Sequence, residues 1–504
     1  MTMKLMDLLK NCPVKDIHGS TDVDLMGMHY DSRQINREDA FFALRGVVSD
    51  GHDYIASAIA NGARVVFCEE MPEPVEDVTI VLVDNTRQAM ALASSEFYGN
   101  PTCDMQTVGV TGTNGKTTIT YLLEAILGEA GLAPAVIGTI NYRFGSDLRQ
   151  APHTTPEALD LMKQVSDFRR NGARSLVMEV SSHALDQNRA DGVNFQVGVF
   201  TNLTPEHLDY HRDMESYFAS KYHLFKELLP RDKGRAVINV DDEYGRRLAA
   251  MLPGAMTCGR SENADIYPES VEVSLSGIRA RVSTPLGTVV INSPLLGDYN
   301  VENLLCAIGA AVALELPPRV IAAGLAEAKG VPGRLELVEN NRGAVILVDY
   351  AHTGDALHRV IEAMQGLSPK RILTVFGCGG DRDRSKRPIM AEVAASGSDI
   401  AIATSDNPRT EDPQQILDDV RVGLARVHKH EWRRQDAIAG AGRGYVVIED
   451  RREALEFAVS LLRPDDLLLV AGKGHEDYQI LAGGRIHFDD REELRNALQR
   501  GDLQ

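Results

Sequence analysis

The sequence lacks most features of secreted, membrane-spanning or nucleic-acid-binding proteins. Its six cysteines include no C-x-x-C pair, which is typical of reduced thiols in a cytosol. No apolar run approaches the roughly 18–20 residues of a spanning helix, and the first residues have no apolar signal core. Lys and Arg number 53 against 72 Asp and Glu, and the net charge of −19 argues against a general nucleic-acid binder. We therefore expect a cytoplasmic protein with no membrane span and no nucleic-acid partner.

Length and apolar patterning predict a multidomain α/β protein. A chain of 504 residues is too long for one core. Short apolar runs alternate with helical segments, which indicates parallel sheets covered by helices. We expect a small α/β domain over 1–101, a parallel-sheet nucleotide domain over 102–334, and a Rossmann-like, doubly wound domain over 335–504. Within the second domain, the alternating pattern of 271–290 predicts an antiparallel appendage.

One stretch of the third predicted domain differs from its surroundings in composition. Residues 428–444 are first basic and then rich in Ala and Gly, and they include Trp432, the only tryptophan. We interpret this stretch as an exposed insertion between a helix and a strand.

The chain is organised around a glycine-rich turn between a short apolar strand and a helix that begins near Lys116. This order surrounds an anion with backbone N–H groups and a helix N-terminus, and the lysine adds a point charge for the outer phosphates. The strict pattern G-x-x-x-x-G-K-[ST] fails only at Val110. The candidate ATP-binding residues are Gly112, Thr113, Asn114, Gly115, Lys116, Thr117 and Thr118.

Three oxygen or imidazole side chains are predicted at the carboxyl ends of strands beside this turn. Thr117, Glu179 and His207 should converge there, because ligands of open α/β sheets bind at that edge. Together they are candidate ligands for Mg²⁺ beside ATP.

Several motifs resemble the ATP-dependent Mur ligases of peptidoglycan synthesis, in the same order over nearly the whole chain. They are T-G-T-N-G-K-T-T at 111–118, E-V-S-S-H at 179–183, T-N-L-T-P-E-H-L-D at 201–209, G-D-Y-N-V-E-N at 297–303, P-G-R at 332–334 and D-Y-A-H at 349–352. Within the family, D-N-P-R at 406–409 and G-K-G-H-E at 472–476 resemble the members that add diaminopimelate. The resemblance implies three domains, for a UDP-sugar, ATP and the incoming amino acid.

The resemblance also implies roles for individual residues. The UDP-muramoyl-dipeptide would be held by Ser32, Thr154, Thr155, Ser181, Gln187 and Arg189. Further ATP contacts would come from Asn300, Arg334, Asp349 and His352. Diaminopimelate would be bound by Arg382, Asp406, Asn407, Pro408, Arg409, Gly472 and Glu476. We expect a monomer whose partners are these small-molecule substrates.

One further implied residue is Lys221, which falls where the family has a carbamylated lysine. As a carbamate it would join the metal ligands, and the implied catalytic residues are Lys116, Lys221 and His207. From the residues alone Lys221 is an ordinary solvated helix lysine, and nothing selects it over Lys226. The chain departs from the family at Gly354, where Pro is usual, and at His153, where Asn is common.

The implied reaction is amide ligation: a carboxylate attacks the γ-phosphate of ATP, and an amine then attacks the acyl phosphate.

Sister activities, adding lysine or extending folate with glutamate, are the first alternatives. Arg409, a residue suited to a second carboxylate, argues against lysine, and the S-S-H-A-L-D-Q-N-R and D-N-P-R segments argue against folate. A switch or transport ATPase would leave the C-terminal motifs unexplained. A regulator with a dead site would not need Lys116, Glu179 and His207.

Overall fold

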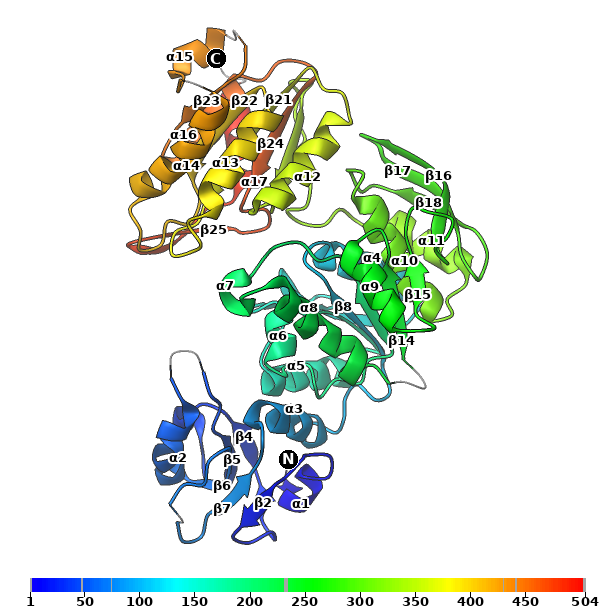
Figure 1. Ribbon diagram of the computed structural model, residues 1–504, viewed down its shortest axis with the longest axis vertical. Coiled ribbons are helices and arrows are strands. Elements are labelled where there is room, and N and C mark those ends of the chain that lie inside the picture. Colours follow the sequence, from blue (N-terminus) through cyan, green and yellow to red (C-terminus); the bar gives the residue numbers. More distant parts are fainter. Residues whose placement is uncertain are drawn as a thin grey trace. The chain divides into compact units, whose positions relative to one another are not determined.

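The computed structural model describes residues 2–46, 49–73, 75–230, 234–428, 430–439 and 442–501 (Figure 1). These residues form two compact units. The first comprises 1–267, 283–289 and 305–324, and the second comprises 268–282, 290–304 and 325–504. The α/β fold class is confirmed, because each predicted domain contains one main sheet with parallel strands. The exact domain boundaries stay a prediction.

The first unit begins with a five-stranded sheet of order β2-β7-β6-β5-β4, in which only β2 runs antiparallel to its neighbour. The apolar runs of β6 and β7 are buried at its centre. The elements of this region are β1 (Met3–Lys4), α1 (Leu5–Leu8), β2 (Asp16–His18), β3 (Asp24–Leu25), β4 (Gly27–His29), η1 (Ser32–Gln34), β5 (Asp39–Phe42), η2 (Gly51–Tyr54), α2 (Ile55–Asn61), β6 (Ala63–Cys68), β7 (Thr79–Leu82) and α3 (Thr86–Phe97).

The same unit contains an eight-stranded sheet of order β11-β10-β9-β12-β8-β13-β14-β15. Six strands are parallel, and β10 and β11 add an antiparallel edge. Its strands are β8 (Gln106–Thr111), β9 (Pro134–Ile137), β10 (Asn141–Phe144), β11 (Asp147–Gln150), β12 (Ser175–Glu179), β13 (Val197–Phe200), β14 (Arg235–Asn239) and β15 (Met256–Cys258). Its helices are α4 (Lys116–Glu129), α5 (Ala158–Arg170), α6 (Ser182–Asp186), α7 (Leu208–His211), α8 (Met214–His223), the π-helical turn η3 (Leu224–Leu228) and α9 (Glu243–Met251).

Helices α3 and α5 join the two sheets of this unit. Ala158 and Leu159 of α5 belong to the same buried apolar cluster as Ala89 and Phe97 of α3. Polar contacts support the junction: Arg87 Nη1 donates to Glu157 Oε2 over 3.1 Å, and the Tyr30 hydroxyl donates to Asp160 Oδ2 over 2.7 Å. The residues next to the eight-stranded sheet are therefore packed directly against the N-terminal region.

A small three-stranded sheet follows, of order β16-β17-β18, where the sequence predicts an appendage. Its strands are β16 (Tyr267–Ser274), β17 (Gly277–Ser283) and β18 (Val289–Ser293), and helices α10 (Asn300–Ala313) and α11 (Pro318–Glu327) come next.

The main sheet of the second unit has the order β19-β20-β24-β21-β22-β23 and is parallel from β20 to β23. Its strands are β19 (Glu336–Leu337), β20 (Val345–Asp349), β21 (Arg371–Cys378), β22 (Ile400–Ser405), β23 (Gly444–Val447) and β24 (Asp466–Ala471). The remaining elements are α12 (Gly354–Gln365), α13 (Lys386–Gly397), α14 (Pro413–Val427), α15 (Arg434–Ala439), α16 (Arg451–Ser460), α17 (Asp490–Gly501) and the hairpin of β25 (Tyr478–Leu481) and β26 (Gly484–His487).

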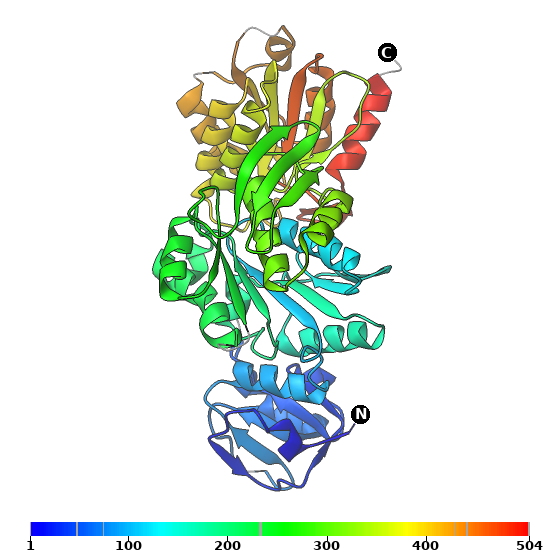
Figure 2. The ribbon, with the colours of Figure 1, turned by 90° about the vertical axis from the view of Figure 1, so that its right-hand side faces the viewer.

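Helices cover both faces of this sheet. One apolar cluster joins the strands to α12, α13 and α14, and a second joins them to α16 and α17. Figure 2 shows α17, in red, on the opposite side of the sheet from the yellow and orange α13 and α14. This doubly wound arrangement leaves the carboxyl ends of the strands free for a binding site.

The stretch 428–444 is less exposed than its composition predicts. Residues 429, 440 and 441 lie outside the described part of the chain, and α15 forms between them. Most described residues of the stretch are exposed, as predicted for an insertion. Trp432, however, is half-buried against the core cluster of α16 and α17. A Cβ on Gly444 would lie 2.3 Å from the Trp432 ring, so the indole lies directly on the first residue of β23.

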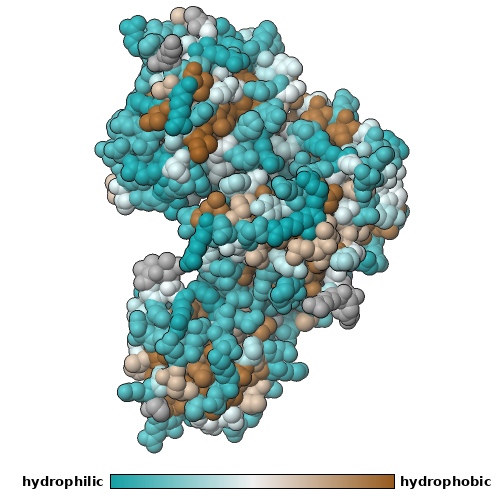
Figure 3. All heavy atoms as spheres, in the orientation of Figure 1, coloured by the Kyte–Doolittle hydropathy of each residue, from teal (hydrophilic) through white to brown (hydrophobic). Residues whose placement is uncertain are grey.

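The surface visible in Figure 3 is mainly hydrophilic, with apolar residues in separate patches. Ile389 and Val422 are examples of large apolar side chains that remain more than half exposed. Within the described ranges, no helix combines the length and apolarity needed to cross a membrane.

Candidate active site

The glycine-rich turn connects β8 to α4 at the carboxyl edge of the eight-stranded sheet. Gly112 has a φ of 146°, and a Cβ there would lie 1.8 Å from Thr201 Oγ1, so only glycine fits. Gly115 has a φ of 89° and precedes the first residue of α4. Val110, where the strict pattern requires glycine, is a fully buried residue of the central strand β8. The departure from the motif therefore lies in the strand and leaves the turn intact.

The loop after β13 supports this turn. The backbone N–H of Thr113 donates to the Asn202 carbonyl, and that of Asn114 donates to Asn202 Oδ1, each over 2.9 Å. Thr201 Oγ1 donates to the Asn114 carbonyl over 2.6 Å. These bonds fix the conformation of the turn before any nucleotide binds.

Lys116 lies over this turn. Its Nζ donates to the carbonyls of Gly112 and Thr113 over 2.8 and 2.7 Å. The ammonium is therefore held at the mouth of the anion site by acceptors that a phosphate oxygen can replace.

Glu179 ends β12, adjacent to β8, and meets Thr117 as the sequence predicts. Thr117 Oγ1 donates to Glu179 Oε2 over 3.1 Å, and Thr139 donates to the same carboxylate through its N–H and its hydroxyl. Glu179 is 1% exposed. A buried carboxylate held by three donors is pre-oriented beside the glycine-rich turn of residues 112–115, called the phosphate turn below.

His207 lies on the neighbouring loop with a φ of 57° and precedes α7. Its ring centroid is 4.8 Å from that of His183, which lies in α6 shortly after Glu179. Burial, opposed by Glu206, lowers the pKa of His207 to about 4. The imidazole is therefore neutral near pH 7 and can offer a lone pair.

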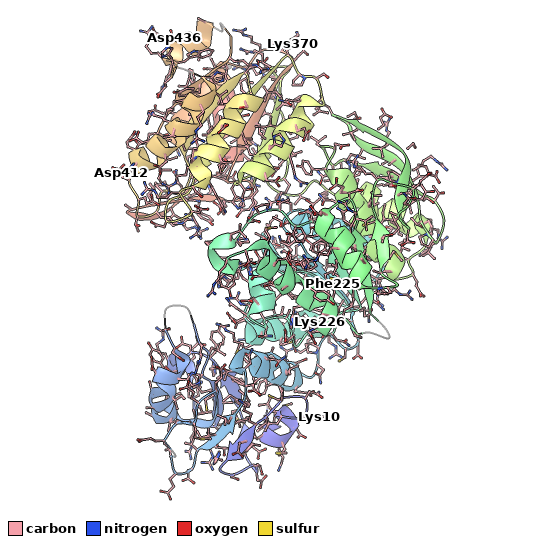
Figure 4. All side chains as sticks on the ribbon, in the orientation of Figure 1. Lys10, Phe225, Lys226, Lys370, Asp412 and Asp436 are labelled. Atoms are coloured by element: carbon pink, nitrogen blue, oxygen red, sulfur yellow. The ribbon has the colours of Figure 1, made fainter. Side chains whose placement is uncertain are left out.

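Lys221 of α8 is buried against the phosphate turn, so the interpretation of it as a solvated helix lysine is wrong. The residue is 1% exposed, its Nζ donates to the Gly112 carbonyl over 2.8 Å, and it lies 4.6 Å from the Tyr217 ring centroid. Burial, and then the nearby Lys116 ammonium, hold the pKa of Lys221 well below its ordinary value. Lys226, by contrast, is an exposed residue of η3 paired with Glu227 (Figure 4).

These donors suit a divalent cation. Mg²⁺ takes oxygen ligands, and the buried Glu179 carboxylate with the Thr117 hydroxyl provides two beside the turn. The low pKa of His207 leaves its imidazole uncharged, which a cation requires. The chemistry of the Thr117 and Glu179 oxygens therefore fits the expected metal, although the described residues include no group of three His, Cys, Asp or Glu side chains placed to hold an ion.

Five of the six residues expected to bind the sugar nucleotide are linked to one another in the first unit. Thr139 Oγ1 bonds Thr154 Oγ1 over 3.1 Å, and Thr155 Oγ1 donates to the Glu179 carbonyl over 2.8 Å and accepts from the Ser181 N–H over 3.2 Å. Arg189 donates to the Thr155 carbonyl and to Gln187 Oε1. Thr155 therefore contacts the backbone of Glu179, and Thr154 is joined to the Glu179 carboxylate through Thr139.

Ser32, the sixth of these residues, belongs to η1 in the N-terminal region. It is buried, and its carbonyl accepts from Asn61 Nδ2 over 2.9 Å. The described contacts do not join it to the other five, so its assignment depends on the motif alone.

The second unit holds the remaining nucleotide candidates. Arg334 lies 4.4 Å from the Tyr350 ring centroid, and His352 Nδ1 lies 2.9 Å from the Tyr350 carbonyl. Asp349 accepts from the N–H groups of Leu335 and Ala351, each over 2.8 Å, and burial raises its pKa despite these donors and Arg334. Three of the four candidates thus cluster around the end of β20.

Asn300, the fourth, is a buried residue at the start of α10. Its side chain donates to the Leu296 carbonyl over 2.6 Å and accepts from Asn303 over 2.7 Å. In this arrangement its amide orders the helix start.

The expected diaminopimelate residues follow three adjacent parallel strands, β24, β21 and β22. Asn407 Nδ2 donates to Glu476 Oε2 over 2.9 Å, which joins the loop after β22 to the loop after β24. Arg409 has a φ of 55°, and its Nη1 donates to the Gly380 carbonyl over 2.6 Å. A Cβ on Gly379 would lie 3.0 Å from Arg409 Nη1 and 3.9 Å from the Arg382 Cγ. The structure therefore brings these residues together as one cluster at the ends of the three strands.

Several residues of these sites were not singled out from the sequence. Thr139 contacts Glu179, and Tyr217 contacts Lys221, but neither Thr139 nor Tyr217 lies in a quoted motif. Tyr350 and Lys473 do lie in quoted motifs, D-Y-A-H and G-K-G-H-E, and motif membership could have identified both.

The two departures from the family have local explanations. Thr353 caps α12 by accepting from the Ala356 N–H, so the helix begins at Gly354 without the usual proline. His153 is exposed, and its carbonyl accepts from the Tyr142 hydroxyl over 2.6 Å.

A pH dependence of stability follows from His475. Burial, and then Arg334 and Arg491, lower its pKa to about 3, and its buried Nδ1 has no hydrogen-bond partner among the described residues. The imidazole of His475 binds a proton more readily in the unfolded chain than in the folded protein. The neutral imidazole therefore contributes fully to folding stability above about pH 6.5, and this contribution is lost as the pH falls toward 3. We expect His475→Gln to reduce the drop in unfolding temperature between about pH 7 and pH 4.5, measured by calorimetry. An unchanged drop would contradict this assignment.

Three family models match the chain. They are the Mur ligase middle domain at residues 110–311, the Mur ligase glutamate ligase domain at 333–474, and the Mur ligase family catalytic domain at 24–98. The matched ranges include strands of all three sheets that carry candidate site residues.

Curated relatives align over the full length. Two of them, both called UDP-N-acetylmuramoyl-L-alanyl-D-glutamate–2,6-diaminopimelate ligase, come from Geobacter metallireducens and Geobacter sulfurreducens. The first is 50% identical over 504 residues, covering 99% of this chain and 98% of the relative. The second is 47% identical over 507 residues, covering 99% of both.

Solved structures share the fold. A structure with the same ligase title is 32% identical and covers 100% of both chains with a TM-score of 0.70. A MurF ligase from Thermotoga maritima in complex with ADP is 18% identical, covers 94% of this chain and 97% of its own, and has a TM-score of 0.60.

Proposed function

The chain belongs to the Mur ligase family of ATP-dependent ligases, and from this premise we propose that it adds meso-2,6-diaminopimelate to UDP-N-acetylmuramoyl-L-alanyl-D-glutamate during peptidoglycan precursor synthesis. The observation that carries the choice of amino acid is the clustering of Asp406, Asn407, Arg409 and Glu476 at the ends of neighbouring strands. We further propose that the enzyme requires Mg²⁺ and acts as a cytoplasmic monomer.

The first half of the reaction takes place at the phosphate turn. The carboxylate of the UDP-muramoyl-dipeptide attacks the γ-phosphorus of ATP, the bond to ADP breaks, and an acyl phosphate forms. The backbone N–H groups of the turn and the Lys116 ammonium stabilise charge on the transferred group. Glu179, Thr117, His207 and a carbamylated Lys221 would hold Mg²⁺, which when bound neutralises phosphate charge.

The second half requires an amine. The free amino group of diaminopimelate attacks the acyl carbon, phosphate leaves, and the nitrogen loses a proton to give the amide. Acyl phosphates hydrolyse readily, so the site must exclude water while the intermediate exists.

Selection of diaminopimelate over lysine requires recognition of one additional carboxylate. That group lies at the end remote from the reacting amine, and a guanidinium can bind it through two parallel hydrogen bonds. Arg409 can supply this guanidinium, while Asp406 and Asn407 bind the ammonium and carboxylate of the same centre. The same feature argues against the lysine-adding and folate-extending alternatives.

We expect Arg409→Ala to raise the KM for diaminopimelate by about two orders of magnitude or more, because the loss of a charged partner at a desolvated site costs on the order of 2–5 kcal/mol. The KM for ATP should change little. Arg434→Ala, which removes an exposed arginine of α15 paired with Glu453, is the matched control and should leave both constants unchanged. A native KM for diaminopimelate in Arg409→Ala would exclude this role.

The overall proposal is tested by incubating the protein with ATP, Mg²⁺, the UDP-muramoyl-dipeptide and diaminopimelate, and measuring product mass. The expected product carries one added diaminopimelate, and omission of any single substrate should abolish it. ATP turnover without the sugar nucleotide would instead support a switch or transport ATPase.

A further inference from the structure

One buried cation in the amino-acid pocket has no role in the proposed mechanism. Lys473 follows β24 and is 0% exposed. Its Nζ lies 3.5 Å from Asp406 Oδ1, 3.4 Å from Asn407 Oδ1 and 3.3 Å from Glu476 Oε2. All three partners are residues expected to bind diaminopimelate, and they come from two different loops.

We propose that Lys473 is a positioning residue of the amino-acid pocket, holding Asp406, Asn407 and Glu476 in the arrangement that binds the substrate. This inference rests on the proposed function, because it assigns those three residues to substrate recognition. Lys473 itself is enclosed by protein and acts through its partners.

The local backbone directs Lys473 inward. Gly472 and Gly474, on either side of it, have φ values of 115° and 54°, a conformation that side chains disfavour. A Cβ on Gly474 would lie 2.6 Å from the Tyr350 Cβ, and one on Gly472 would lie 3.6 Å from Asp406 Oδ2. The two glycines therefore let the loop turn tightly around the lysine and approach its neighbours.

Other bonds hold the two loops together but do not neutralise charge. Gln479 Nε2 donates to the Asp406 carbonyl over 2.7 Å, and the Ile480 N–H donates to Asn407 Oδ1 over 2.9 Å. The Arg409 N–H donates to the Ile480 carbonyl over 3.0 Å. These bonds account for the pairing of the loops. Asn407 Nδ2 also donates to the Glu476 carboxylate, and Lys473 is the cation that contacts both carboxylates.

The electrostatic argument concerns two carboxylates near one nitrogen. The Asp406 and Glu476 side chains are only 11% and 16% exposed, and two such anions repel each other at close range. Lys473 between them offsets this repulsion, and the aromatic ring of Tyr478, 5.5 Å away, adds a favourable cation–π contact. The pocket can then present carboxylates to the ammonium of the substrate without either one turning away.

The test is Lys473→Met, which keeps the length of the side chain and removes its charge. We expect the KM for diaminopimelate to rise about tenfold or more, with kcat at saturating diaminopimelate within about threefold of native, since buried charged contacts of this kind are worth a tenfold change or more. The KM for ATP should be unchanged. Lys473→Arg retains the charge and should recover part of the lost affinity.

The matched control is Arg371→Met. Arg371 pairs with Asp466, which is buried at the opposite end of β24, so this variant breaks an ion pair of the same strand away from the pocket. It should lower the unfolding temperature about as much as Lys473→Met but leave the KM for diaminopimelate native. An equal rise in KM in both variants would show that general destabilisation, and not positioning, is responsible.

Three results would overturn the inference. They are a native KM in Lys473→Met, a loss of kcat with an unchanged KM, and a failure of both Lys473→Met and Lys473→Gln to fold, since a pocket-positioning role is local. Failure of the proposed function is distinguishable, because the native enzyme would then form no product with diaminopimelate.

Discussion

Lys116→Ala is expected to reduce ATP-dependent ligation by about three orders of magnitude or more while the protein stays folded. The Lys116 ammonium lies against the carbonyls of Gly112 and Thr113, at the mouth of the anion site formed by the turn. Removing one preorganised donor from developing charge costs on the order of 10²–10³ in rate, and this donor is also fully charged. Lys116 belongs to none of the described apolar clusters, so its loss should disturb no core packing.

The measurement is ADP release at saturating ATP, with amide product followed in parallel. Thermal unfolding of the variant should match that of the native enzyme. Ligation near the native rate would remove the phosphate turn from the mechanism, and loss of folded protein would show that Lys116 has a structural role instead.

The second large effect is expected at Lys221. A buried amine whose pKa is held well below its ordinary value gives up its proton more readily, and an uncharged amine reacts with CO₂ to give a carbamate, with loss of a proton. The product is an anion beside the phosphate turn, suited to Mg²⁺. Lys221→Ala should therefore be nearly inactive, and small carboxylic acids such as acetate should partly restore it by occupying the vacated space.

Lys226→Ala is the matched control for this prediction. It removes an exposed lysine five residues further along the same helical segment and should retain native activity. Native protein in bicarbonate should also show the added mass of one CO₂, which Lys221→Ala should lack. Full activity of Lys221→Ala, or the same added mass in both proteins, would contradict the carbamate.

The sequence predicts the elements of this fold well where buried strands are short apolar runs. The segments 197–200, 345–348 and 467–470 are all buried strands, because β-branched and leucine side chains at the centre of a parallel sheet are covered on both faces. The turn at 112–115 was equally predictable, since its glycines are required by positive φ and close approach.

Residues whose burial depends on tertiary packing were harder to predict. Lys221 and Lys226 have the same chemistry, and only the packing of α8 against the phosphate turn makes the first a buried amine and the second a surface ion pair. Helix α8 also continues into the π-helical turn η3 at Leu224, which no sequence period signals. The role of Lys473 is hard to predict for a similar reason, because lysine is usually exposed and the burial of this one depends on a carboxylate from a distant loop.

The most direct test of the central claim is a competition between amino acids. The native enzyme is given ATP, the UDP-muramoyl-dipeptide, and equal concentrations of diaminopimelate and lysine, and the two products are separated by mass. A site built to bind a second carboxylate should reject the analogue that lacks it by about 10²-fold or more. We therefore expect the diaminopimelate product almost alone. Equal amounts of both products, or an excess of the lysine product, would contradict the assignment.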